Sequence, residues 1–159
     1  MEKQIKINFE AIESYDYLDA TEKQLFDKAM EIRNVAYAPY SNFTVGCALL
    51  LDNGEIITGS NQENAAYPSG LCAERTAIFY TGANFPKQKI KKLFVIGAPR
   101  NAVESVPIPR CGACRQSVLE YEAKQDEEIE VYFASLTGEI YKTKSIRDLL
   151  PFSFDASYL

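Results

Sequence analysis

The most informative absence in this sequence is histidine, because none of its 159 residues is one. A chain without histidine cannot contain a Ser-His-Asp or Cys-His nucleophile system. Any metal ion must then be held by cysteine or carboxylate ligands, and any general acid or base must be Glu, Asp, Lys, Tyr or Cys. The four cysteines and the acidic residues are therefore the first candidates for a functional site.

Signals for membranes and for secretion are also missing. No stretch is apolar for long enough to span a bilayer, and residues 1–10 interleave Lys, Ile and Asn where a signal peptide would have an apolar run. We therefore expect a cytoplasmic protein with no membrane partner, in a compartment where thiols stay reduced. Four cysteines in such a chain favour metal binding or catalysis over disulfides.

Positive charge is scarce as well. The formal net charge is -5, and the densest group of lysines, in residues 87–92, is best explained as a solvated turn. A protein that binds nucleic acid backbones needs Lys and Arg side chains to offset the negative charge of the phosphates. We therefore expect no nucleic acid partner.

The hydrophobic pattern predicts an α/β fold. The length suggests one domain, which we place at residues 19–159, with residues 1–18 as an N-terminal arm or extension. For the first ten or so residues, an added strand and an arm remain alternatives. Strands are predicted at 43–51, 55–59, 92–97, 129–134 and 140–142, and helices at 20–35, 72–80, 111–121 and 145–150. Their alternation indicates a three-layer α-β-α sandwich with a mixed sheet of about five strands.

Three cysteines have the spacing of a catalytic zinc site. Cys111 and Cys114 form a C-x-x-C pair at a predicted helix start, where positions i and i+3 share one face. Cys72, at another predicted helix start, can supply a third sulfur. Catalytic zinc sites typically take three protein ligands and leave the fourth position to water. We therefore expect one zinc ion per subunit on these three thiolates.

Two alternatives use the same cysteines differently. A closed site of four cysteines would need Cys47, but its place within a predicted strand favours a small buried apolar role. A C-x-x-C pair by itself is also typical of a thioredoxin-like dithiol. Cys72 and Glu74 favour metal over redox chemistry, because a dithiol pair needs neither of them.

Glu74 follows Cys72 by two residues and so lies in the first turn of the same predicted helix. From there its carboxylate can reach a water on the metal and move a proton, although a glutamate at a helix start also commonly balances the helix dipole. Three thiolates and Zn²⁺ sum to a charge of -1, so a nearby guanidinium would restore electrophilicity. We assign that role to Arg75, and expect an ordinary ion pair for Arg115.

These residues resemble a known family. Cys72-Ala-Glu74 followed by Pro109-Arg110-Cys111-Gly-Ala-Cys114 is similar to the zinc-dependent deaminase signature. With Cys as the first ligand, the chain resembles the small cytidine deaminases. Segments 37–43, 61–67 and 149–154 also resemble the family, so the likeness runs from about residue 20 to residue 154.

The resemblance implies hydrolysis of cytidine and deoxycytidine to uridine and deoxyuridine plus ammonia, by a zinc-bound hydroxide with Glu74 as proton shuttle. It implies that Asn61 and Glu63 bind the ribose hydroxyls, that Phe43 stacks near the base and that the Ala73 N–H meets the base carbonyl. It also implies a homotetramer with shared active sites, in which Tyr67 and Phe154 help to build a neighbouring subunit's pocket.

The sequence departs from the family at one point in the motif. The family usually has proline directly before the first cysteine of the C-x-x-C pair, but here Arg110 takes that place and Pro109 precedes it. Two other functions remain open: a related deaminase of another aminopyrimidine nucleoside, such as a nucleoside antibiotic, and a structural zinc module without activity. Nucleotides are disfavoured because no Gly-rich or basic loop could cradle a phosphate.

Overall fold

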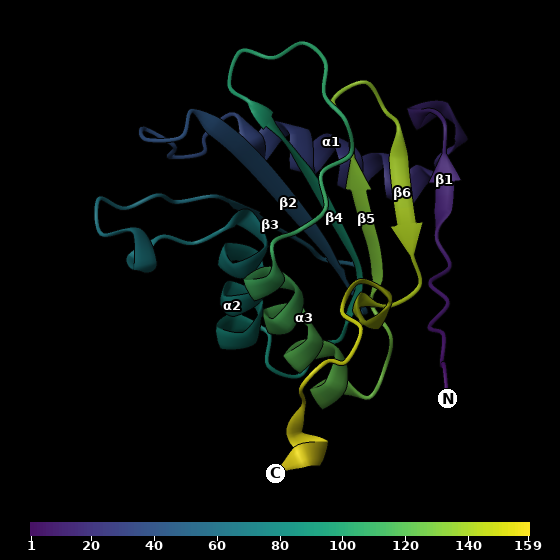
Figure 1. Ribbon diagram of the computed structural model, residues 1–159. Helices are drawn as coiled ribbons and strands as arrows, with labels where there is room; N and C mark the ends of the chain where they lie inside the picture. The colour runs from purple at the N-terminus through teal and green to yellow at the C-terminus, as the bar shows by residue number, and fades with distance from the viewer.

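The computed structural model describes residues 1–159 and contains one mixed sheet of six strands in the order β1-β6-β5-β4-β2-β3 (Figure 1). Only β4 and β5 run parallel; every other neighbouring pair is antiparallel. The strands are β1 Glu10–Ile12, β2 Phe43–Leu51, β3 Ile56–Ser60, β4 Ile90–Pro99, β5 Glu130–Ala134 and β6 Ile140–Thr143.

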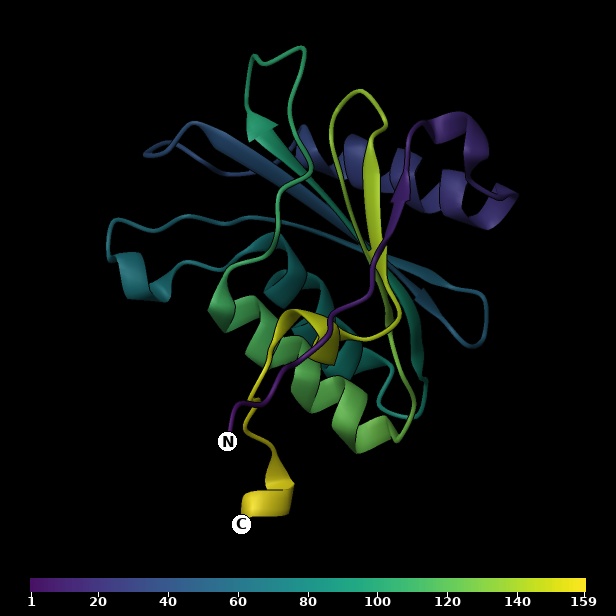
Figure 2. The ribbon, with the colours of Figure 1, turned by 45° about the vertical axis from the view of Figure 1, so that its right-hand side comes forward.

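Helices cover both faces of this sheet. Helix α1 (Ala20–Arg33) lies on one face, and α2 (Ala73–Asn84) and α3 (Gly112–Gln125) lie side by side on the other (Figures 1 and 2). This arrangement confirms the predicted three-layer α-β-α sandwich. The expectation of about five strands is one short, because β1 adds an edge strand next to β6.

The boundaries of the helices have local causes. Asp19 caps α1 by accepting a hydrogen bond from the Glu22 N–H, and the Glu22 carboxylate accepts one from the Asp19 N–H. The helix ends at Arg33, two residues before the predicted end, because the next N–H groups bond three residues back. The last predicted helix, at 145–150, is a short 3₁₀ turn at Ile146–Leu149.

The core has two layers because side chains alternate along the strands. One layer lies between the sheet and α2 and α3, and the other lies between the sheet and α1. The first includes Cys47, Leu49, Leu93, Val95, Val131, Ala77, Ile78, Val118 and Leu119. The second includes Ala48, Phe94, Ile96, Tyr132, Leu25, Phe26 and Ala29.

Two glycines set how closely the helices approach the sheet. A Cβ added to Gly59 on β3 would lie 2.7 Å from the backbone oxygen of Ala73 in α2, and one added to Gly46 on β2 would lie 1.9 Å from that of Ala29 in α1. A side chain at Gly59 would therefore displace the start of α2, which carries Glu74.

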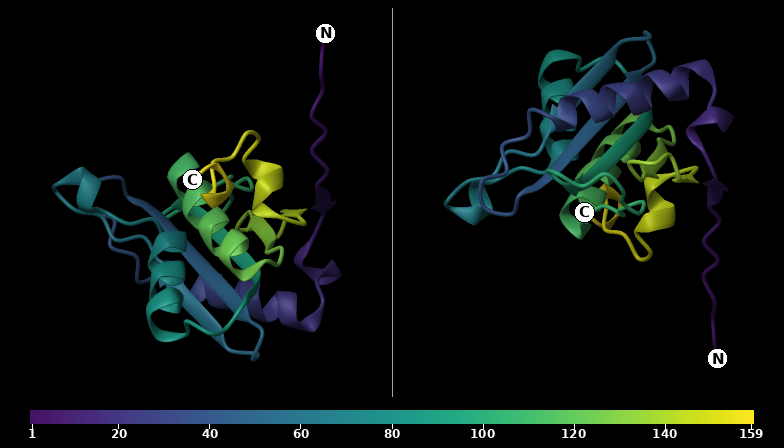
Figure 3. Two further views of the ribbon diagram at one scale, coloured as in Figure 1. Left: turned by 90° about the horizontal axis from the view of Figure 1, so that it is seen from below. Right: turned by 90° about the horizontal axis from the view of Figure 1, so that it is seen from above.

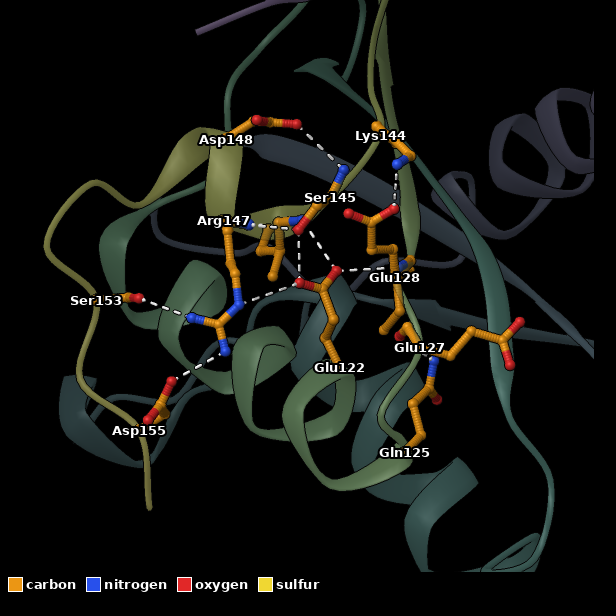
Figure 4. A network of polar contacts seen from close by, with 12 residues as sticks. Glu122, Gln125, Glu127, Glu128, Lys144, Ser145, Arg147, Asp148, Ser153 and Asp155 are labelled. Carbon is orange, nitrogen blue, oxygen red and sulfur yellow. Dashed lines mark hydrogen bonds and ion pairs between the residues drawn. The ribbon is translucent and has the colours of Figure 1, made fainter. Parts of the chain in front are cut away.

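A buried carboxylate joins α3 to the two segments that follow it (Figure 4). Glu122 accepts hydrogen bonds from the hydroxyl of Ser145 at 2.6 Å and from the N–H groups of Ile129 at 2.9 Å and Ile146 at 3.1 Å. Arg147 lies 3.9 Å from the same carboxylate. This network holds α3, the start of β5 and the C-terminal segment in fixed relation.

The two ends of the chain are attached differently. Residues before β1 project from the body of the molecule (Figure 3). The C-terminal segment is tied back by an ion pair of 2.9 Å between Arg147 and Asp155. No helix in the structure combines the length and the apolar character needed to cross a membrane.

Candidate functional site

The three predicted cysteine ligands come together where two helices begin. Cys72 is the N-cap residue of α2 and Cys111 that of α3, while Cys114 lies in the first turn of α3. Neither N-cap side chain bonds to the backbone of its own helix, so both sulfurs remain available. The partial positive charge of a helix N-terminus favours thiolate at such positions.

The distances between the sulfurs fit a zinc ion. The Sγ atoms of Cys111 and Cys114 are 3.4 Å apart, those of Cys72 and Cys111 are 3.9 Å apart, and all three lie within 4.8 Å of one another. Tetrahedral ligands at a Zn–S distance of about 2.3 Å would be about 3.8 Å apart. The donor set therefore has both the chemistry and the spacing that zinc requires, with room for a fourth ligand.

The pKa values of Cys72 and Cys114 are shifted in opposite directions. A hydrogen bond from Cys114, outweighing the opposing effect of burial, lowers the pKa of Cys72 to about 6. The same hydrogen bond, together with burial, raises the pKa of Cys114. The Arg75 guanidinium lies 4.0 Å from the Cys72 sulfur, and this contact raises the pKa of Arg75 despite its desolvation.

The fourth cysteine is not part of the cluster. Cys47 lies inside β2, has none of its surface exposed, and is absent from the group of three sulfurs. Burial raises the pKa of the Cys47 thiol, so it stays neutral. The four-cysteine alternative is therefore not the arrangement that this fold produces.

Glu74 shares a small pocket with the three sulfurs. It lies in the first turn of α2, and only 5% of its side chain is exposed. The pocket has a volume of about 180 Å³. Its other walls are formed by Ser41, Phe43, Val45, Asn61, Val95, Ile108, Pro109 and Arg110. Phe43 and Asn61 thus line the pocket that contains Glu74.

A wider pocket of about 470 Å³ adjoins the first, and the two share Ser41, Asn61 and Cys72. The residues that line only the wider pocket are Tyr40, Gln62, Glu63, Asn64, Tyr67, Gly70, Leu71 and Arg75. The Phe43 ring therefore lines the same pocket as the cysteines, and Glu63 and Asn64 line only the wider pocket.

Asn61 and Glu63 are already hydrogen-bonded within the protein. The Asn61 amide accepts from the Val45 N–H at 2.8 Å and donates to the Phe43 carbonyl at 2.9 Å. Two of its four hydrogen-bonding positions stay open. Glu63 accepts from the Ser41 hydroxyl and from the Tyr40 N–H, and these hydrogen bonds lower the pKa of Glu63. Sequence reasoning missed Ser41, because a serine in a turn carries no distinctive signal.

Three further predicted residues lie at different depths. Ala73 is buried and is the first residue of α2, where backbone N–H groups have no acceptor within the helix. Tyr67 and Phe154 have 75% and 57% of their surface exposed. Phe154 belongs to the C-terminal segment and does not line either pocket of its own chain.

The two arginines that flank the C-x-x-C motif are held in different ways, and Arg115 differs from expectation. Arg115 forms no ion pair; it donates to the carbonyls of Arg110 at 2.9 Å and Leu149 at 2.8 Å. It thereby ties the turn before Cys111 to the C-terminal segment. Arg110 is buried, and its Nε lies 3.9 Å from a carboxylate oxygen of Glu74. Its position beside Cys111 gave no sign that its side chain points inward.

Comparison with known proteins agrees with this geometry. The family model described as "Cytidine and deoxycytidylate deaminase zinc-binding region" matches residues 19–126. This match spans α1 through α3 and includes all three clustered cysteines and Glu74. The chain belongs to this deaminase family. Family membership and the cluster of three sulfurs together give one zinc ion per subunit.

Two curated members of the deaminase family are similar over most of the chain. A cytidine deaminase of Halalkalibacterium halodurans is 37% identical over 134 residues, covering 84% of this chain and 94% of that protein. A cytidine deaminase of Sporosarcina psychrophila is 37% identical over 139 residues, covering 86% and 95%. The similarity is therefore longer than the zinc-binding region alone.

Solved structures of the deaminase family have the same fold. The crystal structure of cytidine deaminase from Burkholderia pseudomallei has a TM-score of 0.72 and 38% identity, and the match covers 83% of this chain and 98% of that one. That of cytidine deaminase from Mycobacterium tuberculosis has a TM-score of 0.65 and 28% identity, covering 86% and 99%.

Proposed function

We propose that this member of the deaminase family hydrolyses cytidine and deoxycytidine to uridine and deoxyuridine, with release of ammonia. The observation that carries the proposal is the pair of joined pockets. The inner one places Glu74 beside three clustered thiols and Phe43, and the outer one presents the Glu63 carboxylate. The relatives named cytidine deaminase support the same activity.

Cys72, Cys111 and Cys114 are the proposed zinc ligands. Zinc bound there supplies a Lewis acid that makes water acidic enough to attack at neutral pH. Arg75 offsets part of the thiolate charge through its contact with Cys72. Because the metal site then carries less net negative charge, it is a better electrophile.

Glu74 is the proposed general acid and base. Its carboxylate lines the inner pocket but is not one of the clustered metal-binding groups. It can therefore accept a proton from water, donate it to the ring nitrogen of the base, and then carry a proton to the departing amine. Its near-complete burial excludes bulk water from these transfers.

The substrate is proposed to bind with its base in the inner pocket and its sugar in the outer one. Phe43 would stack near the base, and the N–H of Ala73 would donate to the base carbonyl. Asn61 and Glu63 would bind the ribose hydroxyls, which offer both donors and acceptors. Asn61 suits this role because it lines both pockets.

We also propose a homotetramer in which Tyr67 and Phe154 reach a neighbouring subunit's pocket. The exposure of both aromatic rings on the single chain is consistent with this assembly, although Tyr67 also lines the wider pocket of its own chain. Within each subunit, residues 19–159 would form the deaminase domain and residues 1–18 an added arm, which contributes the edge strand β1 to the sheet of that domain. We expect a cytoplasmic location, because the four free cysteines need a reducing compartment to remain thiols.

Ammonia release from a panel of cytosine compounds tests the proposed activity. We expect turnover of cytidine and deoxycytidine, and much less of cytidine monophosphate and free cytosine. Turnover of the monophosphate without either nucleoside would overturn the substrate assignment. If none of the four reacts, aminopyrimidine nucleoside antibiotics should be tried next, and inactivity with bound zinc would indicate a structural zinc module.

A further inference from the structure

Arg110, the residue directly before Cys111, has a charged side chain that is buried in the protein interior. None of the Arg110 side chain is exposed. Its hydrogen bond runs from Nη2 to the carbonyl oxygen of Leu93 on β4, at 3.4 Å. Its Nε and Nη1 are buried without an acceptor. A guanidinium with two nitrogens that lack an acceptor is unfavourable in a protein interior unless an anion is close.

Glu74 is the anion that this guanidinium faces. The distance from Arg110 Nε to Glu74 Oε1 is 3.9 Å, and both side chains are buried. The other titratable groups near Arg110 are Cys47, Cys114 and Arg115. Cys47 stays neutral, Cys114 belongs to the metal cluster, and Arg115 is a cation. The Glu74 carboxylate is therefore the partner that remains for Arg110.

We propose that Arg110 is a positioning residue for Glu74, and that its buried guanidinium holds the carboxylate from the interior side and offsets its charge. The inference rests on the proposed deaminase function, since it assigns Arg110 to the residue that moves protons. Arg110 contacts both the Leu93 carbonyl on β4 and the Glu74 carboxylate. Arg75 contacts the cluster at Cys72.

The charges of the site support separate roles for Arg75 and Arg110. Three thiolates and Zn²⁺ sum to -1, and an ionised Glu74 brings the total to -2. Arg75 and Arg110 together restore neutrality. Burying charges is favourable only when they are compensated nearby. The proline usual in the family at this position carries no charge, so this chain contains a cation that the common pattern lacks.

The first test is a double-mutant cycle in thermal unfolding of the zinc-loaded protein, with Arg110→Met, Glu74→Gln and both together. In the native background we expect Glu74→Gln to lower Tm, because it leaves the Arg110 charge unpaired. In the Arg110→Met background the same change should lower Tm by at least about 2 °C less, or raise it. Zinc content is measured in each sample, and one zinc ion per chain is expected throughout.

Arg33→Met is the matched control. Arg33 is also a buried arginine, but it donates to the carbonyls of Thr44, Ala98 and Pro99. Combined with Glu74→Gln, it should give additive changes in Tm. Additive changes for Arg110→Met as well, within about 1 °C, would overturn the proposal. If Arg110→Met does not fold, Arg110→Gln takes its place in the cycle with the same expectation.

The second test separates kcat from KM for cytidine. Arg110→Met should lower kcat about tenfold or more and change KM less than about threefold, because Glu74 acts in the chemical step. Arg110→Lys, which keeps the charge, should retain more activity than Arg110→Met. Unchanged kcat in Arg110→Met would overturn the proposal. If the unmodified protein does not deaminate cytidine, the proposed function fails, whereas the melting cycle still tests the pairing of Arg110 with Glu74.

Discussion

At the level of single residues, the Glu63 carboxylate has two roles, one in the structure of the turn and one in the proposed substrate pocket. Its carboxylate accepts hydrogen bonds from Tyr40 and Ser41, and it also lines the pocket proposed for the sugar. Substrate binding would therefore use a carboxylate whose orientation is already fixed by the protein. Such preorganisation reduces the entropy lost when the substrate binds.

We predict that Glu63→Gln raises KM for cytidine by about ten- to a hundredfold, because a hydrogen bond to a charged group is worth about 1.5–3 kcal/mol. Steady-state kinetics measure the effect. Ser41→Ala is the control, since it removes a donor to Glu63 and leaves the carboxylate in place. An equal rise in KM for both variants would show that the turn matters and that the carboxylate does not bind the sugar.

Some site residues were predictable from sequence and others were not. The i, i+3 spacing of Cys111 and Cys114 and the closeness of Cys72 to Glu74 in sequence are local, and the structure brings these residues together. The burial of Arg110 depends on how α2 and β4 pack around it, which no local pattern reports. Asn61 likewise bonds to β2 through tertiary contacts.

At the scale of elements, helix α3 is positioned by Glu122 at one end and carries Cys111 and Cys114 at the other. We predict that Glu122→Ala lowers the free energy of unfolding by about 2–4 kcal/mol, because it leaves buried N–H groups at Ile129 and Ile146 without their acceptor. Denaturant unfolding measures the loss.

Glu120→Ala is the matched control for this prediction. Glu120 is exposed on the same helix, and its replacement should change stability by less than about 0.5 kcal/mol. A similar loss in both variants would contradict the role of the Glu122 network.

The three α-helices begin within one residue of their predicted starts, but their predicted ends are wrong by two to four residues. Helix α2 runs to Asn84 and α3 to Gln125, each four residues beyond the predicted end. Helix α3 stops where Asp126 takes a left-handed conformation, with φ of 51°. No glycine marks that stop, so the usual sequence signal was missing.

At the scale of the whole molecule, one polar cluster joins α1 to the sheet on the face opposite the active site. Glu22 accepts hydrogen bonds from Lys92 at 3.0 Å and from the Tyr132 hydroxyl at 2.7 Å. Burial would raise the pKa of Glu22, but these hydrogen bonds outweigh it and lower that pKa. Glu130 shares the same partners, and its pKa is lowered for the same reason.

The lowered pKa of Glu22 predicts how stability depends on pH. A carboxyl group whose pKa is lower in the folded state stabilises the fold fully above its ordinary pKa of 4.5. That contribution is lost as the pH falls from 4.5 through the folded-state pKa. Glu22→Gln should therefore lower stability near pH 7 and lose less stability between pH 7 and acid than the unmodified protein does.

Denaturant midpoints measured at several pH values test this dependence. Glu31→Gln is the control, because Glu31 lies on the same helix with 71% of its side chain exposed. Its midpoints should follow those of the unmodified protein. If Glu22→Gln also followed them at every pH, the cluster would not contribute to acid stability.

The alternation of strands and helices predicted the layers of the molecule, but the sequence left open whether the N-terminal residues form an edge strand or an arm. β1 is three residues long, and its position is defined by pairing with β6, more than a hundred residues later in the chain. A strand so short leaves too little periodicity to read. Sheet membership at this edge depends on contacts distant in sequence.

Glu74 is proposed to move protons beside a zinc ion held by Cys72, Cys111 and Cys114. The most direct measurement is zinc content and ammonia release from cytidine in the same preparation of Glu74→Gln. We predict that one zinc ion per chain is retained and that kcat falls by about 10²–10⁴-fold. Retention of zinc with unchanged turnover of cytidine would contradict the account.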